Sequence, residues 1–316
     1  MHPLTPNRRL LQLIVMLIGL SFVAVAQDVA LVSSMRGKVL IKRASGQTQQ
    51  GFVRIQLSPG DEVSTSSDAS AVVMYYTGKE VYMAANKNYI VAGEKGEDPF
   101  LRRLAGVFAN LLWSNKPSKS VLGASRGWKE GDKRVIKGIY PSMNALPDPV
   151  LRFEWIDTHP KPGRKYEVIL RDDLGKIEKS TTVSDTNVAL VRTGSAVLSA
   201  DARHRWQVRD LKSGQQSEET VFSFLTRDEQ EKLTKSLGEI RTTCAQDDAR
   251  RYLLESLLFT DLNMMMQAEA SLRKFTQMKP DVVIGHELLA QVYAKVGKFD
   301  ESIAEQDIVA TMLKAK

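Results

Sequence analysis

Acidic and hydroxyl side chains gather in the segment LSPGDEVSTSSDASAVVMYYTGKEVYM, residues 57–83. They could form a catalytic site, or they could stabilise a turn between strands. General acid–base catalysis needs two carboxylates aimed into one cleft, or a carboxylate beside a histidine. Asp61 and Glu62 are neighbours on an expected strand, so they point to opposite faces, and no histidine is near in sequence. Asp61 follows Gly60, where an Asp usually accepts backbone N–H bonds, and we therefore expect a structural turn.

Motifs placed for other chemistry are missing from the sequence. It has no His-x-x-x-His, no Cys pair and no Gly-rich phosphate loop after a strand, and its one G-x-S-x-G match, at residues 123–127, lies in an expected linker rather than between a strand and a helix. The four histidines are dispersed, and Cys244 is the single cysteine, which excludes an intramolecular disulfide. A lone thiol is more often a small buried apolar group than a reactive one. The sequence thus predicts a protein that is not an enzyme and has no cofactor, metal site or specific small-molecule ligand.

The N-terminus has the parts of a secretory signal peptide. MHPLTPNRR is basic, LLQLIVMLIGLSFVAVA is apolar, and Ala24-Val25-Ala26 is a small-x-small ending. Residues 1–26 are therefore expected to direct export to the periplasm or the extracellular space. The alternative is an uncleaved signal anchor in the inner membrane, although the apolar run is near the lower length limit of a spanning helix.

Composition fits a soluble exported protein with several domains. The chain has 316 residues, of which 43% are hydrophobic and 26% charged, with a formal net charge of +7 at pH 7. A basic exported protein is biased towards an anionic envelope surface, which is a candidate partner. The Lys and Arg residues are scattered rather than clustered, so nucleic acid is not an expected ligand.

Residues 27–93 alternate like strands. VALVSSMRGKVLIKR has a glycine at Gly37 between two β-rich runs, which is typical of a hairpin. Pro59 and Gly60 supply a tight turn, and Thr77-Gly78-Lys79 supplies another between two alternating runs. We therefore expect a small all-β module here.

The same residues resemble the FecR domain, an all-β module with a GD-x-φ-x-T turn followed by two strands joined at a glycine. The matching residues are Gly37, Leu57, Gly60, Asp61, Val63, Thr65, Ala69, Ala71, Val73, Gly78 and Val81. The resemblance implies a structural role in the motif turns for Gly60, Asp61, Thr65 and Gly78. In the best-known members the module is the periplasmic part of an anti-sigma regulator, which needs a cytoplasmic segment before its membrane helix. Only nine residues precede Leu10, so exported FecR-domain proteins with accessory modules are the closer match.

Residues 94–138 are expected to form a helix and a linker. Apolar residues fall at helical spacing: Phe100, Leu101, Leu104, Val107, Phe108, Leu111 and Leu112. This helix could lie on a membrane surface or dock on a neighbouring domain, and its short, weakly basic polar face favours docking.

Residues 139–227 return to a β pattern. Short alternating runs are separated by Pro-, Gly- and Asp-rich turns, which predicts a β-sandwich. PVLRFEW, YEVILRDDLGK and HRWQVRD resemble a fibronectin type III or immunoglobulin-like domain. His204 stands where that pattern usually has Tyr, and we expect a packed, hydrogen-bonded side chain.

Residues 228–316 are expected to be helical, with Asp228 as the first N-cap. A 34-residue repeat aligns Leu254 with Leu288 and Asn263 with Gly297, and both copies resemble tetratricopeptide repeats. The first helix would cap the two copies. The residues expected to bind a protein or peptide are Met264, Met265, Met266 and Tyr293. The methionine run could line an adaptable groove or form helix core plus a turn, and both interpretations stay open.

The expected fold is therefore multidomain: an all-β FecR-like module, a β-sandwich, and an all-α tetratricopeptide-like tail. The expected function is that of an exported, non-enzymatic scaffold of the bacterial cell envelope, which recruits an envelope protein or peptide through the helical tail. The alternative is a FecR-type signal-transduction accessory, a periplasmic sensor held by an uncleaved N-terminal anchor.

Overall fold

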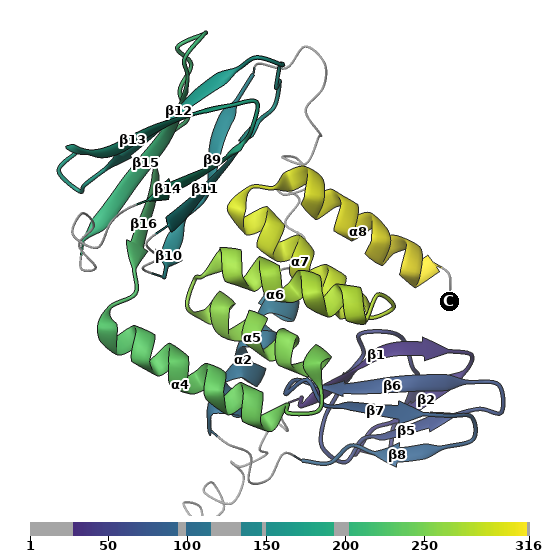
Figure 1. Cartoon of the computed structure of the whole chain (residues 1–316). Coiled ribbons are helices and arrows are strands. Elements are labelled where there is room, and N and C mark those ends of the chain that lie inside the picture. The colour runs from purple at the N-terminus through teal and green to yellow at the C-terminus, as the bar shows by residue number, and fades with distance from the viewer. Residues whose placement is uncertain (1–27, 94–98, 115–133, 147–149, 193–201, 315–316) are drawn as a thin grey trace, which may run out of the picture.

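The computed structural model describes residues 28–93, 99–114, 134–146, 150–192 and 202–314. A helical block lies between two β domains (Figure 1). The predicted signal peptide lies outside the described residues, as does most of the predicted linker. None of the described helices combines the length and the apolar character that crossing a membrane requires.

The N-terminal β domain is a sandwich of two four-stranded sheets. The strand order is β4-β1-β6-β7 in one sheet and β3-β2-β5-β8 in the other. The strands are β1 (Ala30–Arg36), β2 (Val39–Lys42), β3 (Thr48–Gln50), β4 (Gln56–Leu57), β5 (Glu62–Thr65), β6 (Ser70–Tyr75), β7 (Glu80–Met83) and β8 (Asn88–Ile90). All their pairings are antiparallel. The predicted β fold of this region is confirmed.

The predicted hairpin at Gly37 is wrong. β1 pairs with β4 and β6, whereas β2 pairs with β3 and β5, so the two strands belong to different sheets. Gly37 has φ +71°, and a Cβ there would lie 2.9 Å from the carbonyl oxygen of Asp68. The glycine therefore lets the chain cross closely from one sheet to the other, which a two-strand pattern in sequence does not distinguish from a hairpin.

The β4-β1-β6-β7 sheet is buried on both faces where β1 and β6 pair at Leu31 and Met74. Ala71 and Val73 of β6 face the core of the sandwich, while Met74 belongs to the core of the helical block together with Leu31 and Tyr76. Alternating strand residues thus serve two cores. The helical block covers the outer face of this sheet at Leu31 and Met74, while Tyr82 of β7 stays exposed.

The second β domain, here the central sandwich, packs a five-stranded sheet on a three-stranded one. The strand orders are β10-β16-β15-β12-β13 and β14-β11-β9. The strands are β9 (Ile136–Tyr140), β10 (Met143–Ala145), β11 (Val150–Asp157), β12 (Lys165–Arg171), β13 (Ile177–Ser184), β14 (Val188–Arg192), β15 (Arg203–Asp210) and β16 (Thr220–Phe224). The domain begins three residues earlier than the predicted boundary at 139, because β9 pairs with β11 from Ile136.

Aromatic side chains fill the central sandwich. Trp155 and Trp206 are fully buried, and Phe153 meets Trp206 edge to face with ring centroids 5.0 Å apart. His204 is also fully buried, with Nδ1 3.1 Å from a Glu178 carboxylate oxygen and its ring against Phe222. The prediction of a packed, hydrogen-bonded His204 is confirmed.

The helical block contains α2 (Pro99–Ser114), α4 (Arg227–Thr243), α5 (Asp248–Asp261), α6 (Met265–Met278), α7 (Val283–Val296) and α8 (Phe299–Lys314). The N-cap of α4 is Thr226 rather than the predicted Asp228. Thr226 accepts a bond from the Glu229 N–H, and the Glu229 carboxylate accepts one from the Thr226 N–H at 2.8 Å. This reciprocal capping box fixes the start of the helix two residues earlier.

The helices α5 to α8 follow the register of the 34-residue repeat. The aligned residues Asn263 and Gly297 both have left-handed backbone, with φ +56° and +86°. The aligned pair Leu254 and Leu288 is buried. Helix α4 packs on α5, as expected of a cap.

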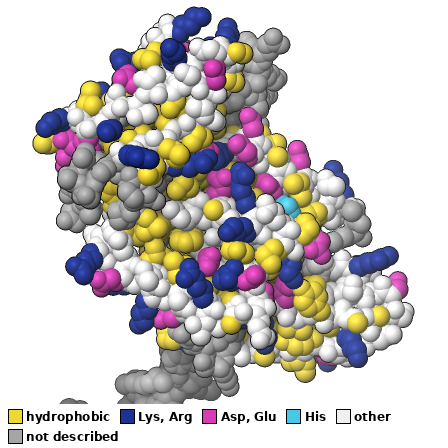
Figure 2. All heavy atoms as spheres, in the orientation of Figure 1, with side chains coloured by type: hydrophobic (Ala, Val, Ile, Leu, Met, Phe, Trp, Pro, Cys, Tyr) yellow, Lys and Arg dark blue, Asp and Glu magenta, His cyan; other side chains and the backbone are white. Residues whose placement is uncertain are grey.

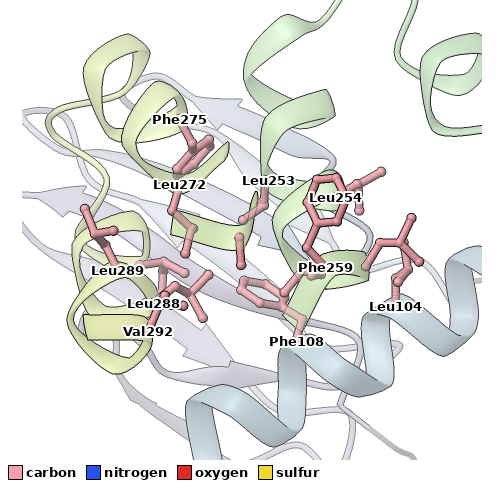
Figure 3. Packing of buried hydrophobic residues seen from close by; sticks show 14 of the residues in the cluster. Leu104, Phe108, Leu253, Leu254, Phe259, Leu272, Phe275, Leu288, Leu289 and Val292 are labelled. Atoms are coloured by element: carbon pink, nitrogen blue, oxygen red, sulfur yellow. The ribbon is translucent and has the colours of Figure 1, made fainter. Parts of the chain in front are cut away.

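Helix α2 belongs to the helical block, although the central sandwich separates it from α4 in sequence. Leu104 and Phe108 of α2 lie among Leu254 and Phe259 of α5 and Leu288 of α7 (Figure 3). The docked interpretation of this helix is therefore confirmed. The central sandwich is an insertion between α2 and α4 of one discontinuous helical domain.

Candidate functional site

Asp61, the acid of the FecR-like turn, is buried within a set of hydrogen bonds. Its carboxylate accepts from Arg43 Nη1 at 2.7 Å and from the backbone N–H groups of Ala44 at 2.9 Å and Ser58 at 3.0 Å. The donors come from the neighbouring strand end and from the turn itself, rather than from two residues further on. These contacts tie the 58–61 turn to the end of β2 and give Asp61 a structural role.

The other motif residues make separate contacts. Thr65 Oγ1 donates to the Ala84 carbonyl at 2.6 Å and accepts from the Lys87 N–H at 3.0 Å. Gly60 and Gly78 have φ +87° and +77°, which their turns require. The Gly78 turn docks on α5, where Arg250 Nε donates to the Thr77 carbonyl at 3.0 Å. The four motif residues therefore shape turns and do not converge on one another.

Of the residues predicted to bind a partner protein, Met265 and Met266 lie where the central sandwich meets the helical block, and Met264 and Tyr293 lie in the core of the helical block. Met264, Met265 and Tyr293 are 0%, 1% and 4% exposed, and Met266 is half-buried. Met265 packs with Ile139 and Tyr140 of β9, and Met266 against the same cluster. The groove interpretation of the methionine run does not fit, because the protein's own sandwich occupies that position. The alternative interpretation, helix core plus a turn, fits the burial.

A buried ion-pair cluster lies at the same contact. Lys298, 4% exposed, places Nζ 2.6 Å from Glu154 Oε1 of β11 and 3.0 Å from Glu269 Oε2 of α6. Tyr140 of β9 donates to Glu269 Oε2 at 2.9 Å. These four residues, together with Arg273, are called the Lys298 junction below. They join two sandwich strands to two helical hairpins.

Each carboxylate of the Lys298 junction lies between two cations. Glu269 also meets Arg273 at 2.9 Å, and Glu154 also meets Arg152 at 3.3 Å. Burial and the negative charge of Glu269 raise the pKa of Tyr140, and they raise that of Tyr293 to about 12. Both phenols therefore stay neutral, and Tyr140 remains a hydrogen-bond donor. Paired charges of this kind hold two surfaces in one orientation.

Three further contacts, which involve Asn144, Lys137 and Gly297, complete this interface. Asn144 Nδ2 donates to the Leu262 carbonyl at 2.8 Å, in the turn between α5 and α6. Lys137 lies across the start of α8, with Nζ 5.2 Å from the centre of the Phe299 ring. A Cβ at Gly297 would fall 2.0 Å from Lys137 Nζ, so this glycine serves both the left-handed helix end and the close approach of β9.

The N-terminal β domain has its own charged contacts with the helical block. Arg54 meets Glu287 of α7 at 3.0 Å, and burial raises the pKa of Glu287 while Arg54 opposes the rise. Lys279, just after α6, places Nζ 3.0 Å from Glu80 Oε2 and 2.7 Å from Tyr82 Oη. Together with the docked Gly78 turn, these contacts fix the domain on α5, α6 and α7.

A second buried cluster lies inside the central sandwich. Arg134 binds Asp157 and Asp210, and Tyr166 donates to Asp157 at 2.6 Å. Burial alone would raise the pKa of Asp157, but hydrogen bonds from Arg134 and Tyr166 outweigh it and lower that pKa to about 2. For Asp210, burial is likewise outweighed by the Lys212 N–H and Arg134, and its pKa is also about 2. The cluster ties the start of the domain to β11 and β15.

Among the described residues, no group of three or more His, Cys, Asp and Glu side chains is placed to hold a metal ion. Cys244 is buried after the end of α4, and burial raises the pKa of its thiol. The thiol packs with Ile240 and Leu253 in the helical core.

Sequence reasoning missed Lys298, Glu154 and Glu269. In the central sandwich, Glu154 falls on the outward face of a strand and looks like an ordinary solvated acid. A signal exists at Glu269, which the 34-residue repeat aligns with Ile303. A charge at a repeat position that is apolar in the other copy indicates a special partner, and here the partner is another domain.

No protein-family model matches the sequence, and no curated protein matches it either. The resemblance of the N-terminal domain to the FecR domain and of the repeat to tetratricopeptide repeats therefore stays a prediction.

Proposed function

We propose that the protein is an exported, non-enzymatic scaffold of the bacterial cell envelope, built from a FecR-like module, a fibronectin- or immunoglobulin-like sandwich and tetratricopeptide-like helices. One observation supports this most: the helical block holds both β domains through charged contacts, buried at the Lys298 junction and partly buried at the Arg54–Glu287 pair. Interfaces between domains of one chain usually permit relative motion. Ion pairs that span both interfaces suit a protein that presents two β surfaces at a fixed spacing.

Exposed apolar side chains of the N-terminal β domain are candidate anchors for a partner. Phe52, Tyr82 and Ile90 are 59%, 65% and 64% exposed. Tyr82 and Ile90 lie on the outer faces of different sheets, so they offer two separate anchors. Apolar side chains also lie exposed among charged groups on the face shown in Figure 2. Large exposed aromatic residues are typical anchors of protein–protein contacts. The partner expected here is another envelope protein, and the net positive charge adds an anionic envelope surface as a further candidate.

A periplasmic sensor of the FecR type is the second candidate. The turn at Gly78 rests directly on α5, with Arg250 bonded to the Thr77 carbonyl. A ligand that changes the N-terminal β domain would thereby change its contact with the helices. The sensor needs residues 1–26 as an uncleaved anchor, whereas the scaffold does not.

The two candidates are separated by the N-terminal mass of the protein purified from its native host, combined with site-specific photo-crosslinking. A crosslinker at Tyr82 tests the proposed surface, and one at Leu174, 90% exposed on the central sandwich, serves as the control. The scaffold predicts a mature start at Gln27 and an adduct with one envelope protein from Tyr82. An intact N-terminus in the membrane fraction would instead support the sensor, and equal adducts from both sites would contradict a specific surface.

A further inference from the structure

Helix α8 carries a stripe of exposed or half-exposed residues at helix-packing spacing. Ile303, Gln306, Ala310 and Leu313, here the α8 seam, follow one another at steps of three, four and three. Such steps place side chains on one face of a helix, as in the contact line of two packed helices. Ser302 is the one buried residue of α8, and Leu313 is 41% exposed.

The repeat shows what covers this stripe elsewhere in the block. The 34-residue register aligns Glu269, Leu272 and Thr276 of α6 with Ile303, Gln306 and Ala310 of α8. The three α6 residues are 8%, 1% and 8% exposed. Helix α6 is packed between α5 and α7, and a Cβ at Gly285 of α7 would touch Phe275 and Thr276.

On α8 the equivalent face is uncovered in the described part of the chain. The helix meets α7 through a neighbouring face, on which Ser302 donates to the Ala290 carbonyl at 2.8 Å and Glu305 meets His286 at 2.6 Å. The seam is therefore the face that accepts the next helix in this packing arrangement.

The seam is complementary to itself. If two copies of α8 pack antiparallel about a two-fold axis that passes between Gln306 and Ala310, Ile303 of one copy lies opposite Leu313 of the other. Gln306 then lies opposite Ala310. Each large apolar side chain meets another, and the long Gln side chain meets the smallest residue of the seam. A parallel arrangement would place Gln306 against Gln306.

Charge favours the same arrangement. Asp300 in the first turn of α8 and Lys314 in its last turn lie on the same flank of the seam. Antiparallel packing brings Asp300 of one helix towards Lys314 of the other, whereas parallel packing keeps these opposite charges at opposite ends. We propose that the α8 seam is a two-fold contact between two copies of this chain.

Sedimentation of the full chain over concentrations up to about 100 μM tests the contact. The wild type is expected to dimerise, and Ala310→Arg, which puts two cations beside the axis, should weaken the dimer by at least about tenfold. Thr311→Arg is the matched control, because Thr311 is exposed on the same helix and points away from the seam. A wild-type monomer throughout, or equal effects of the two variants, would overturn the proposal.

Disulfide trapping tests the orientation. Chains with Ile303→Cys and chains with Leu313→Cys should crosslink when mixed, and neither should crosslink efficiently with itself, because identical positions lie far apart in an antiparallel pair. Native Cys244 is buried and does not interfere. Crosslinking of Ile303→Cys with itself as fast as in the mixture would contradict the antiparallel contact. This dimer does not depend on the proposed scaffold function.

Discussion

Replacing Lys298 by methionine should loosen the central sandwich from the helical block. Methionine keeps much of the apolar stem of lysine, so the change removes mainly the ammonium group. That group is 2.6 Å from Glu154 Oε1 and 3.0 Å from Glu269 Oε2, and both carboxylates are largely buried. Without it, two acids at the interface lose a common cation.

The magnitude follows from the contacts that remain. Removing one partner of a buried ion pair costs about 3–5 kcal/mol. Here Glu269 keeps Arg273 at 2.9 Å and the Tyr140 hydroxyl, and Glu154 keeps Arg152 at 3.3 Å. Because these groups compensate in part, we expect Lys298→Met to lower the free energy of unfolding by about 2–3 kcal/mol.

A double-mutant cycle separates the ion pair from other effects. Glu269→Gln removes one negative charge and keeps the shape, so the double variant should be less destabilised than the two single variants combined, by about 1–2 kcal/mol. Urea unfolding is followed by circular dichroism for the helices and by tryptophan fluorescence, to which the buried Trp155 and Trp206 contribute.

Lys295→Met is the matched control, because Lys295 is an exposed lysine near the end of α7 whose Nζ donates to Asn263 at 3.0 Å. Lys295→Met should lower the free energy of unfolding by less than about 0.5 kcal/mol. The reasoning is refuted if Lys298→Met is as mild as Lys295→Met, or if the cycle shows no coupling between Lys298 and Glu269.

Three further predictions concern the other parts of the molecule. Asp157 and Asp210 each have a pKa near 2 in the folded protein, against about 3.8 in the unfolded chain. Each ionised carboxylate therefore adds about 2 kcal/mol to the free energy of unfolding above pH 4, and this stabilisation is lost as the pH falls towards 2. A melting temperature that stays constant from pH 5 to about pH 2.5 would contradict this prediction. Gly78→Ala should lower the free energy of unfolding by about 1 kcal/mol more than Gly46→Ala, because both glycines have positive φ but only a Cβ at Gly78 would lie within 4 Å of α5. Equal melting temperatures of the two variants would count against docking of the Gly78 turn on α5. The Cys244 thiol should react with a thiol reagent only on unfolding, because burial both shields it and raises its pKa, and fast labelling of the native protein would disprove this.

Local pattern predicted the elements of this protein better than their partners. The alternation around Val73 and Trp155 predicts strands, and the 34-residue period aligns Asn263 with Gly297, which both have left-handed backbone in the structure. The hairpin at Gly37 failed because a crossing between sheets and a turn within one sheet use the same residues. The helix at Pro99–Ser114 was predicted, but its attachment to α5 and α7 depends on contacts far apart in sequence.

The candidate site was harder to predict for a related reason. Met265 and Tyr293 were predicted to bind a partner protein, but Met265 packs against the central sandwich of the same chain and Tyr293 lies in the core of the helical block. An apolar face that receives a partner and one that receives a domain of the same chain have the same composition. Lys298 and Glu154 lie in different domains, so no local pattern connects them.

The insertion of the central sandwich between α2 and α4 sets an order on folding. During synthesis α2 emerges before the helices that bury Leu104 and Phe108, and the whole sandwich is made in between. The outer sheet face of the N-terminal β domain is also completed late, because the same helices cover its Leu31 and Met74. Closing such long loops is slow, so these apolar surfaces stay open until the C-terminal half arrives. A chaperone that binds newly made chains would therefore find its longest-lived targets on α2 and on β1 and β6.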